Sequence, residues 1–134
     1  MYKNFDKWNN LKRETNQKEK ILYFHPRQIW FIRLGQNVGF EQDGKGNEYL
    51  RPVIVLKKFN RRVFWAVPLT TNLKQGNLYF PVNNSGGKRA MAILSQIRLI
   101  DAKRLKYKIG DIEKNVFAEL KKAIAEILLS NDDF

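Results

Sequence analysis

The sequence contains no cysteine and a single histidine, His25, among its 134 residues. Without cysteine the chain has no disulfide, no cysteine-ligated zinc or iron–sulfur centre and no cysteine nucleophile. One histidine also excludes a metal site built from several histidines, although a Ser-His-Asp enzyme stays possible. His25 has no acidic residue close to it in sequence, so we interpret it as a surface histidine ahead of a strand rather than as a general base.

Long hydrophobic runs are missing as well. No stretch approaches the ~20 apolar residues that span a bilayer, and the N-terminal residues hold no apolar run of signal-peptide length. We therefore expect no membrane partner and a cytoplasmic location, which the absence of cysteine also fits.

Common nucleotide-binding and hydrolase motifs are absent: there is no GxxxxGK(S/T), GxGxxG, GxSxG or HExxH pattern. The acidic residues of the central segment are too scattered in sequence to indicate a carboxylate metal site; they are Glu41, Asp43, Glu48 and Asp101. We therefore expect no metal and no cofactor, and any catalysis should depend on Arg, Lys, Thr, Ser or Glu side chains.

Positive charge is what the sequence has in excess. Lys and Arg number 25 against 13 Asp and Glu, which gives a net charge of +12. Residues 25–110 hold sixteen basic and four acidic residues, whereas residues 1–24 carry a net +3 and residues 111–134 a net −3. Charge concentrated in this way favours nucleic acid or another polyanion as partner, although solvated strand faces can also collect Lys and Arg.

Two amphipathic helices are expected near the ends of the chain. The first covers residues 4–20, where Phe5, Trp8, Leu11 and Thr15 recur at spacings of three and four. The second covers residues 111–129, with an apolar stripe of Ile, Val and Leu and with Asp111 as its cap.

Between these helices the pattern predicts a β-rich body. Residues 35–50 hold four glycines without periodicity and should form a long loop. Strands are expected over residues 28–34, 51–58, 62–69, 78–82, 90–94 and 96–100, with one helical turn within 101–108. Short strands, brief turns and no alternation of strands with helices indicate a mainly β (α+β) fold, a small barrel rather than a doubly wound parallel sheet.

Three polar residues stand at the ends of predicted strands. Arg51 lies where the glycine-rich loop enters a buried strand, and its planar guanidinium matches phosphate oxygens. Thr70 and Thr71 follow the strand 62–69, where a hydroxyl can donate to a phosphate oxygen in a transition state. Taken alone, these residues fit better a strand-edge arginine and ordinary loop hydroxyls that bond the backbone.

Aromatic residues are candidates for base stacking where they lie outside strands. Phe40 and Tyr49, both in the long loop, fit that role better than the strand aromatics, which we expect in the core.

Four segments in this order resemble the PemK/MazF family, the toxins of type II toxin–antitoxin pairs. They read QIWFIRLGQNVGFEQ, RPVIVLKKF, FWAVPLTTN and LSQIRLIDAKRL, and with the closing helix they cover residues 27–128. The resemblance implies an SH3-like barrel of the CcdB/PemK type with a C-terminal helix. It also implies a homodimer that cleaves single-stranded RNA at short motifs without a metal, leaving 2′,3′-cyclic phosphate and 5′-hydroxyl ends. A cognate antitoxin protein would block the RNA groove.

The resemblance also assigns residues. The family's catalytic arginine and threonine fall on Arg51 and Thr70. Because a guanidinium is a poor base, we expect Arg51 to stabilise charge on the phosphorus and Thr70 to donate to a non-bridging oxygen. Residues expected to contact RNA are Glu41, which could instead orient Arg51, together with Gln42, Thr71 and Gln96.

Three features depart from the family pattern. The loop segment 43–50 is longer than usual, and Ser95 stands where many members have an acidic residue. The chain also begins with residues outside the core pattern, so we divide it into an N-terminal helical extension, 1–24, and a barrel domain with its C-terminal helix, 25–134.

Two other functions stay open. One is a non-catalytic toxin that binds a protein such as gyrase on the same barrel. The other is an SH3-like nucleic-acid-binding module that leaves its ligand intact. The basic composition does not separate these from a ribonuclease.

Overall fold

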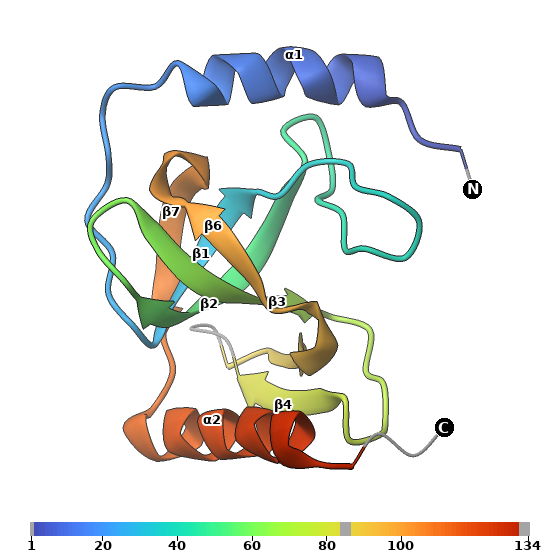
Figure 1. The fold of residues 1–134 in the computed structure, drawn as a ribbon, viewed down its shortest axis with the longest axis vertical. Helices are drawn as coiled ribbons and strands as arrows, with labels where there is room; N and C mark the ends of the chain where they lie inside the picture. The colour runs from blue at the N-terminus through green and yellow to red at the C-terminus, as the bar shows by residue number, and fades with distance from the viewer. Residues whose placement is uncertain (1, 84–86, 132–134) are drawn as a thin grey trace.

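The computed structural model describes residues 2–83 and 87–131, and it places a strongly curved antiparallel sheet between two helices (Figure 1). The elements in chain order are α1 (Phe5–Asn16), β1 (Gln28–Arg33), β2 (Leu50–Lys58), β3 (Val63–Thr70), β4 (Tyr79–Asn83), β5 (Arg89–Ile93), the 3₁₀ turn η1 (Leu94–Gln96), β6 (Arg98–Asp101), the 3₁₀ turn η2 (Ala102–Arg104), β7 (Leu105–Asp111) and α2 (Lys114–Leu129). The expected mainly β barrel with a helix at each end is confirmed.

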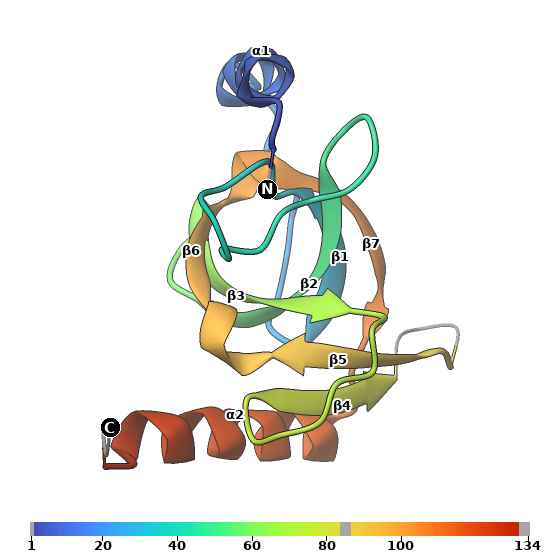
Figure 2. The same ribbon diagram turned by 90° about the vertical axis from the view of Figure 1, so that its right-hand side faces the viewer.

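The sheet curls into a barrel in which η2 links β6 to β7 and β3 takes part in two portions of the sheet. The strand order is β4-β5-β3-β2-β1-β7, and β6 pairs with β3 off this path. β3 pairs with β6 through Val63–Ala66 and with β5 through Leu69 and Thr70, so one strand belongs to two parts of the sheet. Figure 2 shows the resulting ring of β6, β3, β2, β1 and β7, with α1 at one end of the molecule and α2 at the other.

Alternation along the strands divides the core into two layers. In β2, Val53 and Val55 face the barrel interior, while Ile54 between them faces the layer that α2 covers. α2 contributes Phe117 and Leu120 to that second layer. The strands that carry the candidate site are therefore buried on both faces, which makes their ends rigid supports.

The N-terminal helix is shorter than expected. α1 begins after Asn4, whose side chain accepts a hydrogen bond from the N–H of Lys7, and it ends at Asn16 rather than at residue 20. The residues that follow, QKEK, hold no apolar position that would bury a further turn.

The expected start of the C-terminal helix was wrong. α2 begins at Lys114 with Glu113 in the N-cap position, and Asp111 does not cap it. Asp111 is instead the last residue of β7, where it pairs with Gln28 of β1 and forms an ion pair with Lys108 at 3.1 Å.

β7 is a strand that the sequence analysis missed. The expected helical turn within 101–108 exists as η2, but residues 105–111 form a strand paired with β1. The alternation in LKYKI is a strand pattern, although a short one dominated by lysine. Its hydrogen-bond partner lies far away in sequence, so only the tertiary structure completes it.

Candidate functional site

Arg51 and Thr70 lie side by side at the ends of two paired strands. β2 and β3 are antiparallel with Val53 opposite Pro68, and the same register continued by two residues sets Arg51 opposite Thr70. The Nη1 of Arg51 donates to the carbonyl of Leu69 at 2.9 Å, one residue before Thr70. The structure therefore brings together the two residues that the sequence analysis assigned to catalysis.

The guanidinium of Arg51 is held by backbone groups. Its Nε donates to the carbonyl of Asp43, in the β1–β2 loop, while Nη1 bonds Leu69. Only 6% of Arg51 is exposed. Within the described part of the chain Nη2 makes no hydrogen bond, so it is the nitrogen available to an incoming anion.

The charge of Arg51 is retained in this setting. Burial lowers the pKa of Arg51 below its ordinary value, while the nearby charge of Asp43 acts in the opposite direction. An arginine starts far above neutrality, so the side chain stays a cation and acts as a fixed positive charge rather than as a base.

Thr70 is also nearly buried, with 9% of its surface exposed. Its Oγ1 accepts a hydrogen bond from the N–H of Asn72 at 3.2 Å. Because the oxygen serves as acceptor there, the hydroxyl proton is left to donate elsewhere. Thr71, next to it, is exposed to solvent.

A second group of site residues gathers around Gln96 in η1. The Oε1 of Gln96 accepts from the backbone N–H of Gln42 at 3.1 Å, and its Nε2 donates to the carbonyl of Phe40 at 3.0 Å. Gln96 thus fastens the β1–β2 loop to the barrel across more than fifty residues of sequence. Glu41, on the same loop, accepts from the N–H of Val38 at 3.0 Å.

These residues border a surface hollow of about 410 Å³, lined by Asn37, Glu41, Gln42, Ser95, Gln96, Ile97 and Arg98. Its size suits a nucleotide-sized group. Arg51 and Thr70 do not line it, so the candidate site has a buried polar pair and a separate, open hollow. The two are joined at Asp43, which follows Gln42 and binds Arg51.

Another hollow of about 410 Å³ adjoins Thr70. Leu73, Lys74, Gln75, Gly76, Tyr79, Pro81, Arg89 and Met91 line it, and Met91 is the β5 residue paired with Thr70. Lys74 and Arg89 give this second hollow a positive wall, whereas the first carries both Arg98 and Glu41.

The two loop aromatics, Phe40 and Tyr49, differ in their exposure to solvent. Phe40 is 91% exposed, as base stacking requires. Tyr49 is only 7% exposed and packs edge-on against Trp8 of α1, with ring centroids 5.5 Å apart. Tyr49 is therefore a core residue, and the expectation that it would be available for stacking was wrong.

The structure shows one site residue that sequence reasoning missed. Asp43 had been counted among scattered acids, yet it contacts Arg51 through its backbone carbonyl. A carbonyl is common to every residue type, so no pattern in the sequence could have identified this contact. Glu41, which had been considered as a residue that orients Arg51, bonds its own loop instead.

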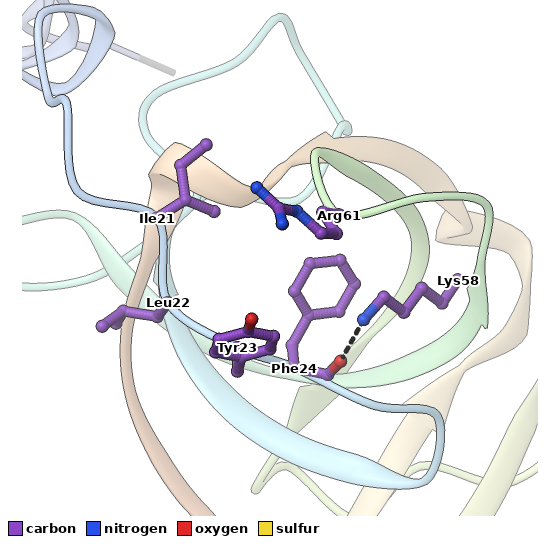
Figure 3. A pocket seen from close by; sticks show the side chains of 6 residues that line it. All are labelled: Ile21, Leu22, Tyr23, Phe24, Lys58 and Arg61. Carbon is purple, nitrogen blue, oxygen red and sulfur yellow. Dashed lines mark hydrogen bonds between the residues drawn. The ribbon is translucent and has the colours of Figure 1, made fainter.

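A small hollow of about 70 Å³ lies elsewhere, between the segment Ile21–Phe24 and the β2–β3 turn (Figure 3). Lys58 lies on one side of it and donates to the carbonyl of Phe24 at 2.9 Å, with its ammonium 4.6 Å from the centroid of that ring. None of the candidate site residues lines it, and it is too small for a nucleotide.

The described residues contain no cluster of three or more His, Cys, Asp or Glu side chains that could hold a metal ion. No helix within residues 2–83 and 87–131 has the length and apolar character needed to span a bilayer.

Solved structures of toxins share this fold. The chain superimposes on "Mycobacterium tuberculosis toxin MazF-mt6" with a TM-score of 0.61 and 18% identity, covering 78% of this chain and 99% of that one. MazF from Deinococcus radiodurans gives a TM-score of 0.64 at 16% identity, covering 82% and 98%. An endoribonuclease from a mycobacterial species, solved in complex with its cognate antitoxin, gives 0.59 at 14% identity, covering 81% and 99%.

Among curated proteins no sequence matches the chain significantly. A family model does: that of the PemK-like, MazF-like toxins of type II toxin–antitoxin systems matches residues 25–128, which include both strands that carry Arg51 and Thr70. The chain therefore belongs to the PemK-like, MazF-like toxin family of type II toxin–antitoxin systems.

Proposed function

We propose that this toxin is a metal-independent endoribonuclease that cleaves single-stranded RNA at a short sequence motif, with Arg51 and Thr70 as its catalytic residues. One observation carries the proposal: Arg51 bonds the carbonyl of Leu69, so a buried cation and Thr70 lie next to each other where β2 begins and β3 ends. Such a pair suits a phosphodiester because negative charge accumulates on the non-bridging oxygens as the phosphorus becomes five-coordinate.

The reaction follows from that charge. The 2′-oxygen of a ribose forms a bond to the adjacent phosphorus, and the bond from phosphorus to the 5′-oxygen breaks. The 2′-hydroxyl loses its proton to solvent water, and the departing 5′-oxygen takes a proton from solvent water. The products are a 2′,3′-cyclic phosphate and a 5′-hydroxyl end. Arg51 keeps its proton throughout and supplies positive charge through Nη2, while Thr70 donates its hydroxyl proton to a non-bridging oxygen.

The open hollow supports a role in reading the RNA. Glu41, Gln42 and Gln96 line it, and they offer both acceptors and donors to a base edge. Thr71 is exposed beside Thr70, and we infer that its hydroxyl contacts the RNA backbone. The exposed ring of Phe40 adds a stacking surface next to these residues.

We infer three further properties. The chain forms a homodimer, since RNA longer than one small barrel face needs a groove from two subunits. A cognate antitoxin of acidic character competes for that groove, as the net charge of +12 favours. The protein acts in the cytoplasm, where messenger RNA is translated, and residues 1–24 are an extension added to a barrel domain at 25–134.

The decisive experiment is incubation of the purified full chain with total RNA in EDTA, beside Arg51→Ala. We expect discrete fragments from the wild type, with 5′ ends that polynucleotide kinase labels directly because they carry a hydroxyl. Primer extension would then map the cleaved motif. Arg51→Ala needs a thermal melt as control, because the change leaves the carbonyls of Asp43 and Leu69 without this donor.

Other outcomes would favour the other functions. Intact RNA after incubation with folded wild type would overturn the proposal. Binding of RNA with steep salt dependence but no cleavage would indicate a binding module. Growth inhibition that persists in Arg51→Ala without RNA cleavage would indicate a protein target such as gyrase. Light scattering that shows a monomer at micromolar concentration would contradict the homodimer.

A further inference from the structure

Lys3, just before α1, is buried to a degree unusual for lysine. Only 8% of its side chain is exposed. Its Nζ donates to the carbonyls of Asn37 at 2.6 Å and Gly39 at 3.0 Å, and it forms an ion pair with Oδ2 of Asp43 at 2.9 Å. An ammonium group has three N–H donors, so all three are used on one loop.

Asp43 connects this lysine to the candidate catalytic arginine. Its Oδ1 accepts from the N–H of Asn37 at 2.6 Å, and its Oδ2 pairs with Lys3. Its backbone carbonyl accepts from Nε of Arg51. The position of Asp43 therefore affects the orientation of the guanidinium, and Lys3 is one of the two groups that fix its carboxylate.

The rest of α1 lies on the same loop. Trp8 is buried against Tyr49, and the Nζ of Lys7 donates to Oδ1 of Asn47 at 3.1 Å. Figures 1 and 2 show α1 lying across the end of the barrel from which this loop projects. The far end of α1 is also held away from this loop, because Arg33 of β1 donates to the hydroxyl of Thr15 at 3.1 Å and Lys103 donates to the carbonyl of Asn16 at 2.9 Å.

The ion pair between Lys3 and Asp43 also changes the net charge near Arg51. The carboxylate of Asp43 is close enough to Arg51 to act on its pKa. Without a partner of its own, that carboxylate would compete with a phosphate for the positive charge. Lys3 offsets that negative charge through its ion pair with the carboxylate at 2.9 Å.

We propose that Lys3 is a positioning residue: by fixing Asp43 it holds the Arg51 guanidinium so that Nη2 faces the scissile phosphate. This inference rests on the proposed ribonuclease function. It assigns to the N-terminal extension a direct part in assembling the site of the barrel. Small displacements of a group that stabilises a transition state are costly, so we expect the effect of Lys3 on turnover rather than on binding.

The test compares Lys3→Met with Lys12→Met in the full chain. Both changes remove one positive charge from the N-terminal segment, but Lys12 is exposed and makes no hydrogen bond or ion pair with the described residues. We expect Lys3→Met to lower kcat on an RNA substrate by about tenfold with KM within about twofold, and Lys12→Met to leave kcat unchanged. Lys3→Arg should recover part of the loss.

Hydrogen exchange supplies a readout that does not depend on RNA. The amides of Asn37 and Gln42 are bonded within the loop or to Gln96, so they should be protected in the wild type. In Lys3→Met we expect them to exchange about tenfold faster, whereas Lys12→Met should match the wild type. Asp43→Asn, which keeps the carbonyl to Arg51 but removes the ion pair, should behave as Lys3→Met does.

The outcomes separate this inference from the proposed function. If the wild type cleaves no RNA, the ribonuclease proposal fails, and exchange alone decides whether Lys3 holds the loop. Unchanged exchange and unchanged kcat in both Lys3→Met and Asp43→Asn would overturn the inference. A rise in kcat, or equal losses in Lys3→Met and Lys12→Met, would overturn it as well. A lower melting temperature of Lys3→Met with normal kcat would show that the contact only stabilises the fold, and this would also overturn the inference.

Discussion

Replacing Thr70 by valine is the cleanest test of the catalytic pair. Valine keeps the branched shape and strand preference of threonine and removes only the hydroxyl. In the folded protein that hydroxyl accepts one hydrogen bond, from the N–H of Asn72 at 3.2 Å. Losing a bond of this kind costs about 1 kcal/mol of folding free energy, which is small beside the 5–15 kcal/mol typical of a domain.

The expected loss of activity is much larger. Removing a single donor from a developing oxyanion lowers kcat by about 10²–10³, or about 2.7–4 kcal/mol of transition-state stabilisation. Because Thr70→Val leaves the protein folded, unfolding cannot account for such a loss. The damage should appear in kcat, with KM little changed, since the bond strengthens only as the phosphorus gains charge.

The assay is steady-state cleavage of a fluorogenic RNA that carries the mapped motif, with thermal melts run in parallel. Thr71→Val provides the comparison: its hydroxyl is exposed and assigned to RNA binding, so it should raise KM a few-fold without a matching fall in kcat. A Thr70→Val enzyme that melts normally and keeps kcat within about threefold of wild type would refute the assignment of Thr70.

Three further predictions follow from the contacts of the site and of α1. Arg51→Lys keeps the charge but has no fork to bond the carbonyls of both Asp43 and Leu69, so kcat should fall at least about tenfold, and urea denaturation should show a loss of about 1–3 kcal/mol. Normal kcat would show that charge alone suffices. Gly35→Ala places a Cβ 2.3 Å from the Trp8 ring at a φ of +90°, so it should cost more than about 2 kcal/mol, against about 1 kcal/mol for Gly39→Ala, where nothing lies within 4 Å. Equal costs would contradict the docking of α1 on the loop. Hydrogen bonds from Arg33 and Lys106 lower the pKa of Glu48 below its ordinary 4.5, so its stabilising contribution is present above that pH and is lost as the pH falls through the lowered value. Glu48 is half-exposed, so Glu48→Gln should cost no more than about 1 kcal/mol at pH 7, and in urea denaturation the difference from wild type should shrink as the pH falls through the lowered pKa of Glu48; a difference independent of pH would rule out this ion pair as its source.

Local patterns in the sequence predicted most of the barrel. The apolar segments that became β1, β2 and β3 are recognisable because strands buried on both faces need continuous Val, Ile and aromatic residues. β7 was not predicted because its pattern is short and lysine-rich, and because the hydrogen bonds that stabilise it come from pairing with β1. Asp111 was taken for a helix cap because cap preference is local, whereas pairing with Gln28 is not.

The candidate site divides in the same way. Sequence alone determined that Arg51 and Thr70 stand at neighbouring strand ends, because a short turn joins the two apolar segments. Their direct pairing came from the tertiary structure, because a register shift between Val55 and Lys57 moves the pairing of β2 and β3 by one residue. Only the tertiary structure decided what holds Arg51, because the contacts are the carbonyls of Asp43 and Leu69, and carbonyls carry no sequence identity. It also decided that Lys3 reaches Asp43 across forty residues, since that contact exists only once α1 has packed onto the loop. The sequence by itself determines which side chains are present, but the backbone groups that orient those side chains come together only through packing between distant segments.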